Sequence, residues 1–159
     1  MIFKDYYCTF NDPFPKNFIA EIKKEGLANQ PKKASVGVLD KKKNTKIRNS
    51  KISWIKNPLI YDHTNPYIHK ANLLCNWNFE WDWNEAPQFT QYEQNNFYDW
   101  HVDTCTDAYS KGPQKGKLRK LSSILLLSEP GKDFEGGELE MDFDSCGGKG
   151  KKIVTELKK

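Results

Sequence analysis

The sequence lacks long apolar runs and contains little arginine. Its longest apolar run, residues 124–127, is far too short to cross a bilayer. The first residues, Met1 to Asp5, contain no apolar signal core and include an acidic residue, so we expect a cytoplasmic protein without a secretory signal. Among 25 basic residues, the arginines are Arg48 and Arg119. Because arginine makes most bidentate contacts to bases and phosphates, we rank nucleic-acid binding last.

The sequence also lacks closely spaced cysteines. Its four cysteines are Cys8, Cys75, Cys105 and Cys146. No C-x-x-C pair is present, which excludes a zinc ribbon and a thioredoxin-type motif. In a cytoplasmic protein we expect four reduced thiols. The lysine clusters at 41–43 and 149–152 are interpreted as solvated loops.

The chain has 159 residues, of which 13% are aromatic, with a formal charge of +4. This length and aromatic content predict one globular domain over residues 1–159. Within it, residues 1–75 are expected to support a core formed by residues 76–159. Most of the tryptophans are interpreted as core or rim residues.

Two amphipathic helices are predicted in the first half. Residues 16–25 place three apolar side chains on one helical face, and Gly26 follows as a typical C-cap. Asn65-Pro66 opens a second helical pattern that continues to Leu74.

The second half alternates apolar and polar residues, which is typical of strands. The predicted strands cover residues 34–39 and 52–55 in the first half, and residues 79–83, 89–93, 121–128, 138–143 and 153–157 in the second. The run at 121–128 is apolar enough to be buried on both faces. Helices followed by short strands predict an α+β fold with helices on an antiparallel sandwich or barrel.

The candidate site is His101-Val102-Asp103. In an extended chain, side chains at i and i+2 lie on the same face, so His101 and Asp103 are expected to face one metal ion. One histidine, one carboxylate and a second, distant histidine form the facial triad of non-haem iron oxygenases. The alternative is a surface His–Asp pair near a turn.

The motif has a distinctive context. In order along the chain come Tyr92, Tyr98, His101-Val102-Asp103, Arg119-x-x-Ser122 and Gly136-Gly137-Glu138-Leu139. Over roughly residues 88–143 this series resembles the prolyl 4-hydroxylase-like branch of the Fe(II)/2-oxoglutarate-dependent dioxygenases. The resemblance implies a double-stranded β-helix, or jelly roll, against which the N-terminal helices pack.

The resemblance also implies roles for individual residues. His101 and Asp103 match two iron ligands, and Tyr92 matches the hydroxyl that helps to bind 2-oxoglutarate. Tyr98 is expected to line the pocket. Both tyrosines could instead be only core or wall aromatics. Gly136-Gly137 is expected to form a tight turn.

The implied reaction hydroxylates an unactivated C–H bond and releases succinate and CO2. A peptidyl prolyl or similar side chain is the expected substrate, carried by a protein or a small molecule, and ascorbate is expected to keep Fe(2+) reduced. The oligomeric state is not indicated by the sequence.

The sequence departs from the family after Asp103, because no histidine follows. The family requires a distal histidine and a basic residue that pairs with 2-oxoglutarate. We expect neither His63 nor His69 to be the third ligand, and a bystander role for Cys105. For Arg48 we expect a surface role, and the alternative is that it reaches the substrate cleft. The simplest interpretation is that the sequence stops before the final jelly-roll strands. The alternative is a catalytically inactive jelly-roll binding module.

Overall fold

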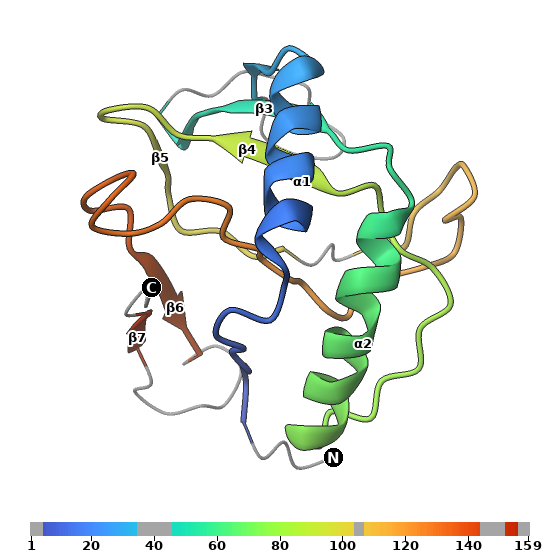
Figure 1. Cartoon of the computed structure of the whole chain (residues 1–159). Coiled ribbons are helices and arrows are strands. Elements are labelled where there is room, and N and C mark those ends of the chain that lie inside the picture. Colours follow the sequence, from blue (N-terminus) through green and yellow to red (C-terminus); the bar gives the residue numbers. More distant parts are fainter. Residues whose placement is uncertain (1–4, 35–45, 104–106, 144–151, 156–159) are drawn as a thin grey trace. The chain divides into compact units, whose positions relative to one another are not determined.

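The computed structural model describes residues 5–34, 46–103, 107–143 and 152–155 (Figure 1). The helices of this part of the chain are α1 (Lys16–Ala28) and α2 (Leu59–Leu74). Its strands are β1 (Lys32–Lys33), β2 (Arg48–Asn49), β3 (Lys51–Trp54), β4 (Gln88–Gln91), β5 (Phe97–Tyr98), β6 (Leu139–Asp142) and β7 (Lys152–Thr155). The mixture of helices and small antiparallel sheets confirms the predicted α+β class. The three small sheets do not by themselves form a jelly roll.

The chain divides into two compact units. One unit comprises residues 1–19, 58–79 and 125–159, and the other comprises residues 20–57 and 80–124. The second unit contains all of the site residues predicted from the H-x-D motif and its two tyrosines. No helix in the described residues is long and apolar enough to span a membrane.

The second unit contains a three-stranded antiparallel sheet in the order β1-β3-β4. In its register, Ser53 of β3 lies opposite Phe89 of β4. The predicted strands at 52–55 and 89–93 are therefore confirmed, and their observed ends differ from the predicted ends by at most two residues. A second antiparallel pair, β2 with β5, places Arg48 opposite Tyr98. Neither of these two-residue strands is predicted, because so short a segment has no visible alternation.

Gly26 lies inside α1, so its predicted role as the C-cap is wrong. A Cβ atom built on Gly26 would lie 2.3 Å from ring atoms of Phe89. The Ser53 hydroxyl donates a hydrogen bond of 2.6 Å to the Gly26 carbonyl. Glycine here allows the helix to lie close to β3 and β4, as Figure 1 shows for these three elements.

The helix α2, in the first unit, begins at Leu59, earlier than the Asn65 start predicted from the sequence. Pro66 is therefore inside the helix, where it lacks the N–H that would bond to the Asp62 carbonyl. Buried side chains on either side of the proline, Ile60 and Ala71, stabilise the helix despite that loss.

The predicted strand at 79–83 is wrong, because these residues have no regular structure. The buried Asn72 side chain accepts a hydrogen bond of 3.0 Å from the Phe79 N–H and donates one of 2.8 Å to the Phe79 carbonyl. It thus takes the place of a neighbouring strand. Asn76 and Asn78 have φ values of 55° and 54°, which are incompatible with an extended chain.

The predicted buried strand at 121–128 is also wrong. These residues form no strand, and Ile124 and Leu126 are 70% and 42% exposed. An apolar run becomes a buried strand only when neighbouring strands supply ladder partners and cover both faces. Among the described residues, no strand pairs with this segment.

In the first unit, β6 and β7 form an antiparallel pair with Leu139 opposite Thr155. The predicted strand at 138–143 is confirmed, and the last predicted strand is confirmed from its start to Thr155. Gly136 and Gly137 have φ values of 72° and 70°, as expected for a tight glycine turn.

Several predictions lie wholly or largely outside the described residues. These are the strand at 34–39, the lysine clusters at 41–43 and 149–152, Cys105 and Cys146.

Candidate metal centre

His101 and Asp103 lie together, although the segment that holds them is not a strand. The Nε2 atom of His101 is 3.3 Å from Oδ1 of Asp103. That the two side chains face one metal ion stays a prediction, and the strand from which it is derived is absent. β5 ends at Tyr98, and the chain bends before it reaches the two residues.

The backbone determines which nitrogen of His101 is available. Nδ1 lies 2.8 Å from the Asp99 carbonyl oxygen, which can only accept a hydrogen bond. Nδ1 therefore carries a proton, and in a neutral ring the lone pair of Nε2 points at Asp103. A proton or a metal ion between these two atoms would interact favourably with both.

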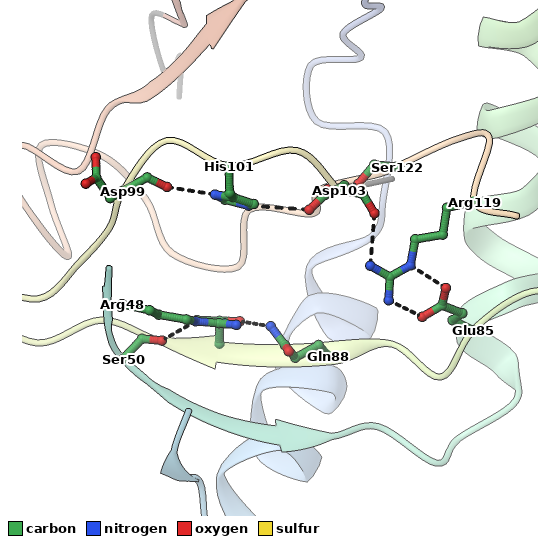
Figure 2. A network of polar contacts seen from close by, with 10 residues as sticks. Arg48, Ser50, Glu85, Gln88, Asp99, His101, Asp103, Arg119 and Ser122 are labelled. Carbon is green, nitrogen blue, oxygen red and sulfur yellow. Dashed lines mark hydrogen bonds and ion pairs between the residues drawn. The ribbon is translucent and has the colours of Figure 1, made fainter. Parts of the chain in front are cut away.

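Asp103 is held by two residues of the R-x-x-S motif (Figure 2). The Ser122 hydroxyl donates a hydrogen bond to Oδ2, the carboxylate oxygen that does not face His101. Arg119 donates from Nη1 to the Asp103 backbone carbonyl at 3.0 Å. These contacts leave Oδ1 directed toward Nε2, and outer partners of this kind orient the ligands of metal sites.

Arg119 is itself fixed by Glu85. Its Nε donates to one carboxylate oxygen of Glu85, and its Nη2 donates to the other at 2.6 Å. Tyr109 donates a further hydrogen bond of 2.8 Å to the same carboxylate. The hydrogen bond from Arg119 lowers the pKa of Glu85 below its ordinary value, although burial opposes that shift. The sequence contains no signal for Glu85, because it is 34 residues from Arg119 and outside every motif.

The two predicted tyrosines differ in their contacts. The Tyr98 ring stacks on the His101 ring with centroids 3.6 Å apart and an angle of 11° between their planes. Tyr92 follows β4 and is about half exposed. Burial raises the pKa of the Tyr92 phenol, while the nearby charge of Arg48 opposes that rise. The Tyr92 hydroxyl is therefore a hydrogen-bond donor at neutral pH.

Arg48 is 6% exposed, so the predicted surface role is wrong. Its Nε donates to Ser50 Oγ at 2.9 Å, and its guanidinium carbon lies 4.4 Å from the Tyr98 ring centroid. The pairing of β2 with β5 explains this position, because residues opposite one another in an antiparallel pair project to the same side.

The two donor atoms, His101 Nε2 and Asp103 Oδ1, are of types that bind a metal such as Fe(II). Imidazole and carboxylate are ligands typical of non-haem iron. Two atoms bound at about 2.1 Å on adjacent corners of an octahedron are about 3.0 Å apart, close to the Nε2–Oδ1 distance. Within the described ranges, no group of three or more histidine, cysteine, aspartate or glutamate residues could hold a metal. In the described part of the chain, His101 and Asp103 offer one imidazole and one carboxylate, and a facial triad requires one further ligand.

The other two histidines lie on α2 in the first unit. His63 stacks on Phe18 with ring centroids 4.1 Å apart, and its Nδ1 lies 2.9 Å from the Leu59 carbonyl. These contacts are those of a packed helix residue. His69 is exposed.

Residues 87–157 match the family model described as the 2OG-Fe(II) oxygenase superfamily. The matched segment contains Tyr92, Tyr98, His101 and Asp103. The match supports the resemblance at the level of the superfamily, and with it a dioxygenase-type activity that uses iron and 2-oxoglutarate. It does not distinguish the prolyl 4-hydroxylase-like branch. The chain matches no curated protein and no solved structure.

Proposed function

We propose that the protein is a non-haem Fe(II) and 2-oxoglutarate-dependent oxygenase that hydroxylates an unactivated C–H bond. The observation that carries the proposal is the 3.3 Å approach of His101 Nε2 to Asp103 Oδ1, with the proton of His101 directed away to Asp99. Both side chains are exposed, as the alternative of a surface His–Asp pair also predicts, but Ser122 holds the opposite carboxylate oxygen and leaves Oδ1 toward Nε2. The superfamily match over the same residues supports this interpretation.

In the proposed mechanism, His101 would bind iron through Nε2 and Asp103 through Oδ1. The bound iron with 2-oxoglutarate supplies activation of O2, so that 2-oxoglutarate, O2 and a C–H bond become succinate, CO2 and a C–OH group. Asp99 keeps Nδ1 protonated, and Ser122 keeps Oδ2 occupied, so each ligand offers one donor atom. Tyr98 restricts rotation of the imidazole by stacking on it.

Tyr92 would donate a hydrogen bond from its hydroxyl to 2-oxoglutarate. Its raised pKa keeps the phenol protonated throughout the physiological range, which suits a donor to a carboxylate. We further propose a peptidyl prolyl or similar side chain as the substrate, following the order of motifs from Tyr92 to Gly137. Ascorbate, the reductant that the resemblance implies, belongs in the assay.

His101→Ala tests the function directly. Iron-dependent formation of succinate from 2-oxoglutarate is expected to fall by at least about 100-fold, because even partners that only orient ligands contribute 10- to 100-fold. Retention of Fe(II) after gel filtration is expected to fall with it. His69→Ala, an exposed histidine of α2, is the matched control and should leave both quantities unchanged. Equal succinate formation by His101→Ala and wild type would overturn the assignment.

The second candidate function is a catalytically inactive binding module. The observation that favours it is the absence of a third metal-ligating group beside His101 and Asp103 in the described residues. It predicts that wild-type protein binds neither Fe(II) nor 2-oxoglutarate measurably and forms no succinate. The same assay therefore separates the two functions.

A further inference from the structure

Two groups orient the His101 imidazole, and both depend on the strand β2. The Asp99 carbonyl oxygen lies 2.8 Å from His101 Nδ1, and the Tyr98 ring is stacked on the imidazole with 3.6 Å between their centroids. Arg48 is opposite Tyr98 in the pairing of β2 with β5. The Asp99 N–H continues this pairing by donating a hydrogen bond of 2.8 Å to the Ile47 carbonyl. The segment that orients His101 is therefore joined to β2 and to the residue before it.

The Arg48 guanidinium lies on the face of Tyr98 that His101 does not cover. The planes of the two rings differ by 11°, so the imidazole covers one face of the phenol ring. Arg48 Cζ is 4.4 Å from the centroid of the same ring, and only the opposite face has room for it. The phenol ring is thus held between a cation and an imidazole, and tilting it weakens a favourable contact on either side.

Arg48 is suited to hold the ring because its own side chain is fixed. It is 6% exposed, and its Nε donates a hydrogen bond of 2.9 Å to Ser50 Oγ (Figure 2). Ser50 is itself 2% exposed. An apolar side chain of similar size could pack on Tyr98 without the loss of hydration that burying a guanidinium entails. What the guanidinium adds is a directed cation–π contact with the ring.

We propose that Arg48 is a positioning residue for His101 that acts through the Tyr98 ring. The guanidinium fixes the phenol ring, and the phenol ring fixes the imidazole. β2 lies outside residues 87–157, so this support comes from a part of the chain that the family model does not match. The consequence for metal binding rests on the proposed function, whereas the orientation of the imidazole does not.

The orientation of His101 is measured in metal-free protein from the NMR signals of its imidazole protons. The chain contains three histidines, so the signals that disappear in His101→Ala are those of His101. Protons above the face of a phenol ring are shifted upfield, so these signals are expected upfield of those of the exposed His69. Arg48→Gln should move them toward the His69 positions, because the ring loses its cation–π contact. Signals at the same positions in Arg48→Gln and wild type would overturn the proposal.

Two further variants separate positioning from a general loss of stability. Ile22→Val removes a buried methylene from the same unit and should leave the His101 signals in place. A displacement as large as that in Arg48→Gln would show that loosening of the unit, and not Arg48, moves the ring. Arg48→Lys keeps the charge but loses the planar group that bonds to Ser50, so it should displace the signals by less. If Arg48→Gln does not fold, Arg48→Lys decides, and unchanged signals in it would count against the proposal.

Titration with Co(II), which accepts the same ligands as Fe(II) and absorbs visible light, tests the consequence for the metal. We expect Arg48→Gln to weaken Co(II) binding by about 10-fold, because partners that orient ligands contribute 10- to 100-fold. Removing a positive charge would by itself favour binding of a cation, so weaker binding indicates lost positioning. Lys51→Gln removes an exposed cation from β3 and should bind Co(II) as wild type does.

The two measurements fail in different ways. Displaced His101 signals with an unchanged Co(II) affinity would overturn the role of Arg48 in metal binding. No binding of Co(II) by wild type would sink the proposed function, and the NMR comparison would still decide whether Arg48 positions His101. Weaker Co(II) binding together with displaced His101 signals in Arg48→Gln, and neither change in Lys51→Gln, is the result expected.

Discussion

Two regions of the same unit are stabilised by different forces. In the helix–sheet layer, formed by α1, β3 and β4, apolar side chains such as Ile22 and Phe89 are 2% and 8% exposed. In the polar segment, defined as residues 107–124, apolar side chains such as Ile124 are largely exposed. That segment is instead joined to residues 82–85 by ion pairs of Lys117 and Arg119.

The difference shows how the two halves of the candidate metal centre depend on their surroundings. His101 is oriented by its own neighbours, Tyr98 and Asp99. Asp103 is oriented by Ser122 and Arg119 of the polar segment. We therefore expect salt and acid to disturb the surroundings of Asp103. Substitutions that change side-chain volume should instead disturb the helix–sheet layer.

The largest effect is expected for Gly26→Ala, within the layer. In an ordinary helix this change stabilises by about 1 kcal/mol. Here the added Cβ would meet the Phe89 ring at 2.3 Å, so we expect a loss of about 1–3 kcal/mol in the free energy of unfolding. Urea denaturation followed by circular dichroism measures it. The control Ala20→Val adds bulk on the exposed face of α1 and should cost only its lower helix propensity, about 0.5–0.7 kcal/mol.

Glu85→Gln tests the polar segment and should have a smaller effect. It removes the negative charge that faces Arg119, and we expect a loss of about 1 kcal/mol at low salt, since both side chains are partly exposed. The matched control is Glu93→Gln, which removes an exposed ion pair with Lys51 and should cost less than about 0.5 kcal/mol. Equal losses for the two variants would show that the Glu85 contacts do not stabilise the segment.

The effect of Glu85→Gln on stability should also depend on pH. Because the pKa of Glu85 is lowered on folding, its contribution is fully present above its unfolded pKa of about 4.3. The contribution is lost as pH falls through the lower, folded value. The difference in stability between wild type and Glu85→Gln should therefore shrink below about pH 4. A difference that grows on acidification would contradict the assigned direction.

The smallest effect is expected for Ile124→Val. Making the same substitution at Ile22 measures how much the burial of the side chain contributes to stability. Ile22→Val removes a methylene from a side chain that is 2% exposed and should cost about 0.5–1.5 kcal/mol. Ile124→Val removes the same group from a side chain that is 70% exposed and should cost almost nothing. A cost at Ile124 as large as at Ile22 would mean that the apolar run is buried, as the sequence alone predicts.

How well the sequence predicts a feature depends on how far apart along the chain the residues that form it lie. The α1 helix depends on neighbours within a few residues, whereas the predicted strands at 52–55, 89–93 and 138–143 are present because β3 pairs with β4 and β6 pairs with β7. The strands predicted at 79–83 and 121–128 are absent, since a strand requires a partner that alternation cannot identify. The local pattern predicts a helix end at Gly26, because the close contact between helix and sheet there leaves no trace in neighbouring residues.

By itself, the sequence determined the chemistry that this chain can offer: an imidazole and a carboxylate two residues apart, two tyrosines before them, and two arginines in all. The tertiary structure decided which of these groups became neighbours. It buried Arg48 against Tyr98, joined Glu85 to Arg119 and brought Ser122 to Asp103. The physical reason is that short-range preferences are set by adjacent residues, whereas burial and ion pairing depend on segments far apart in the chain.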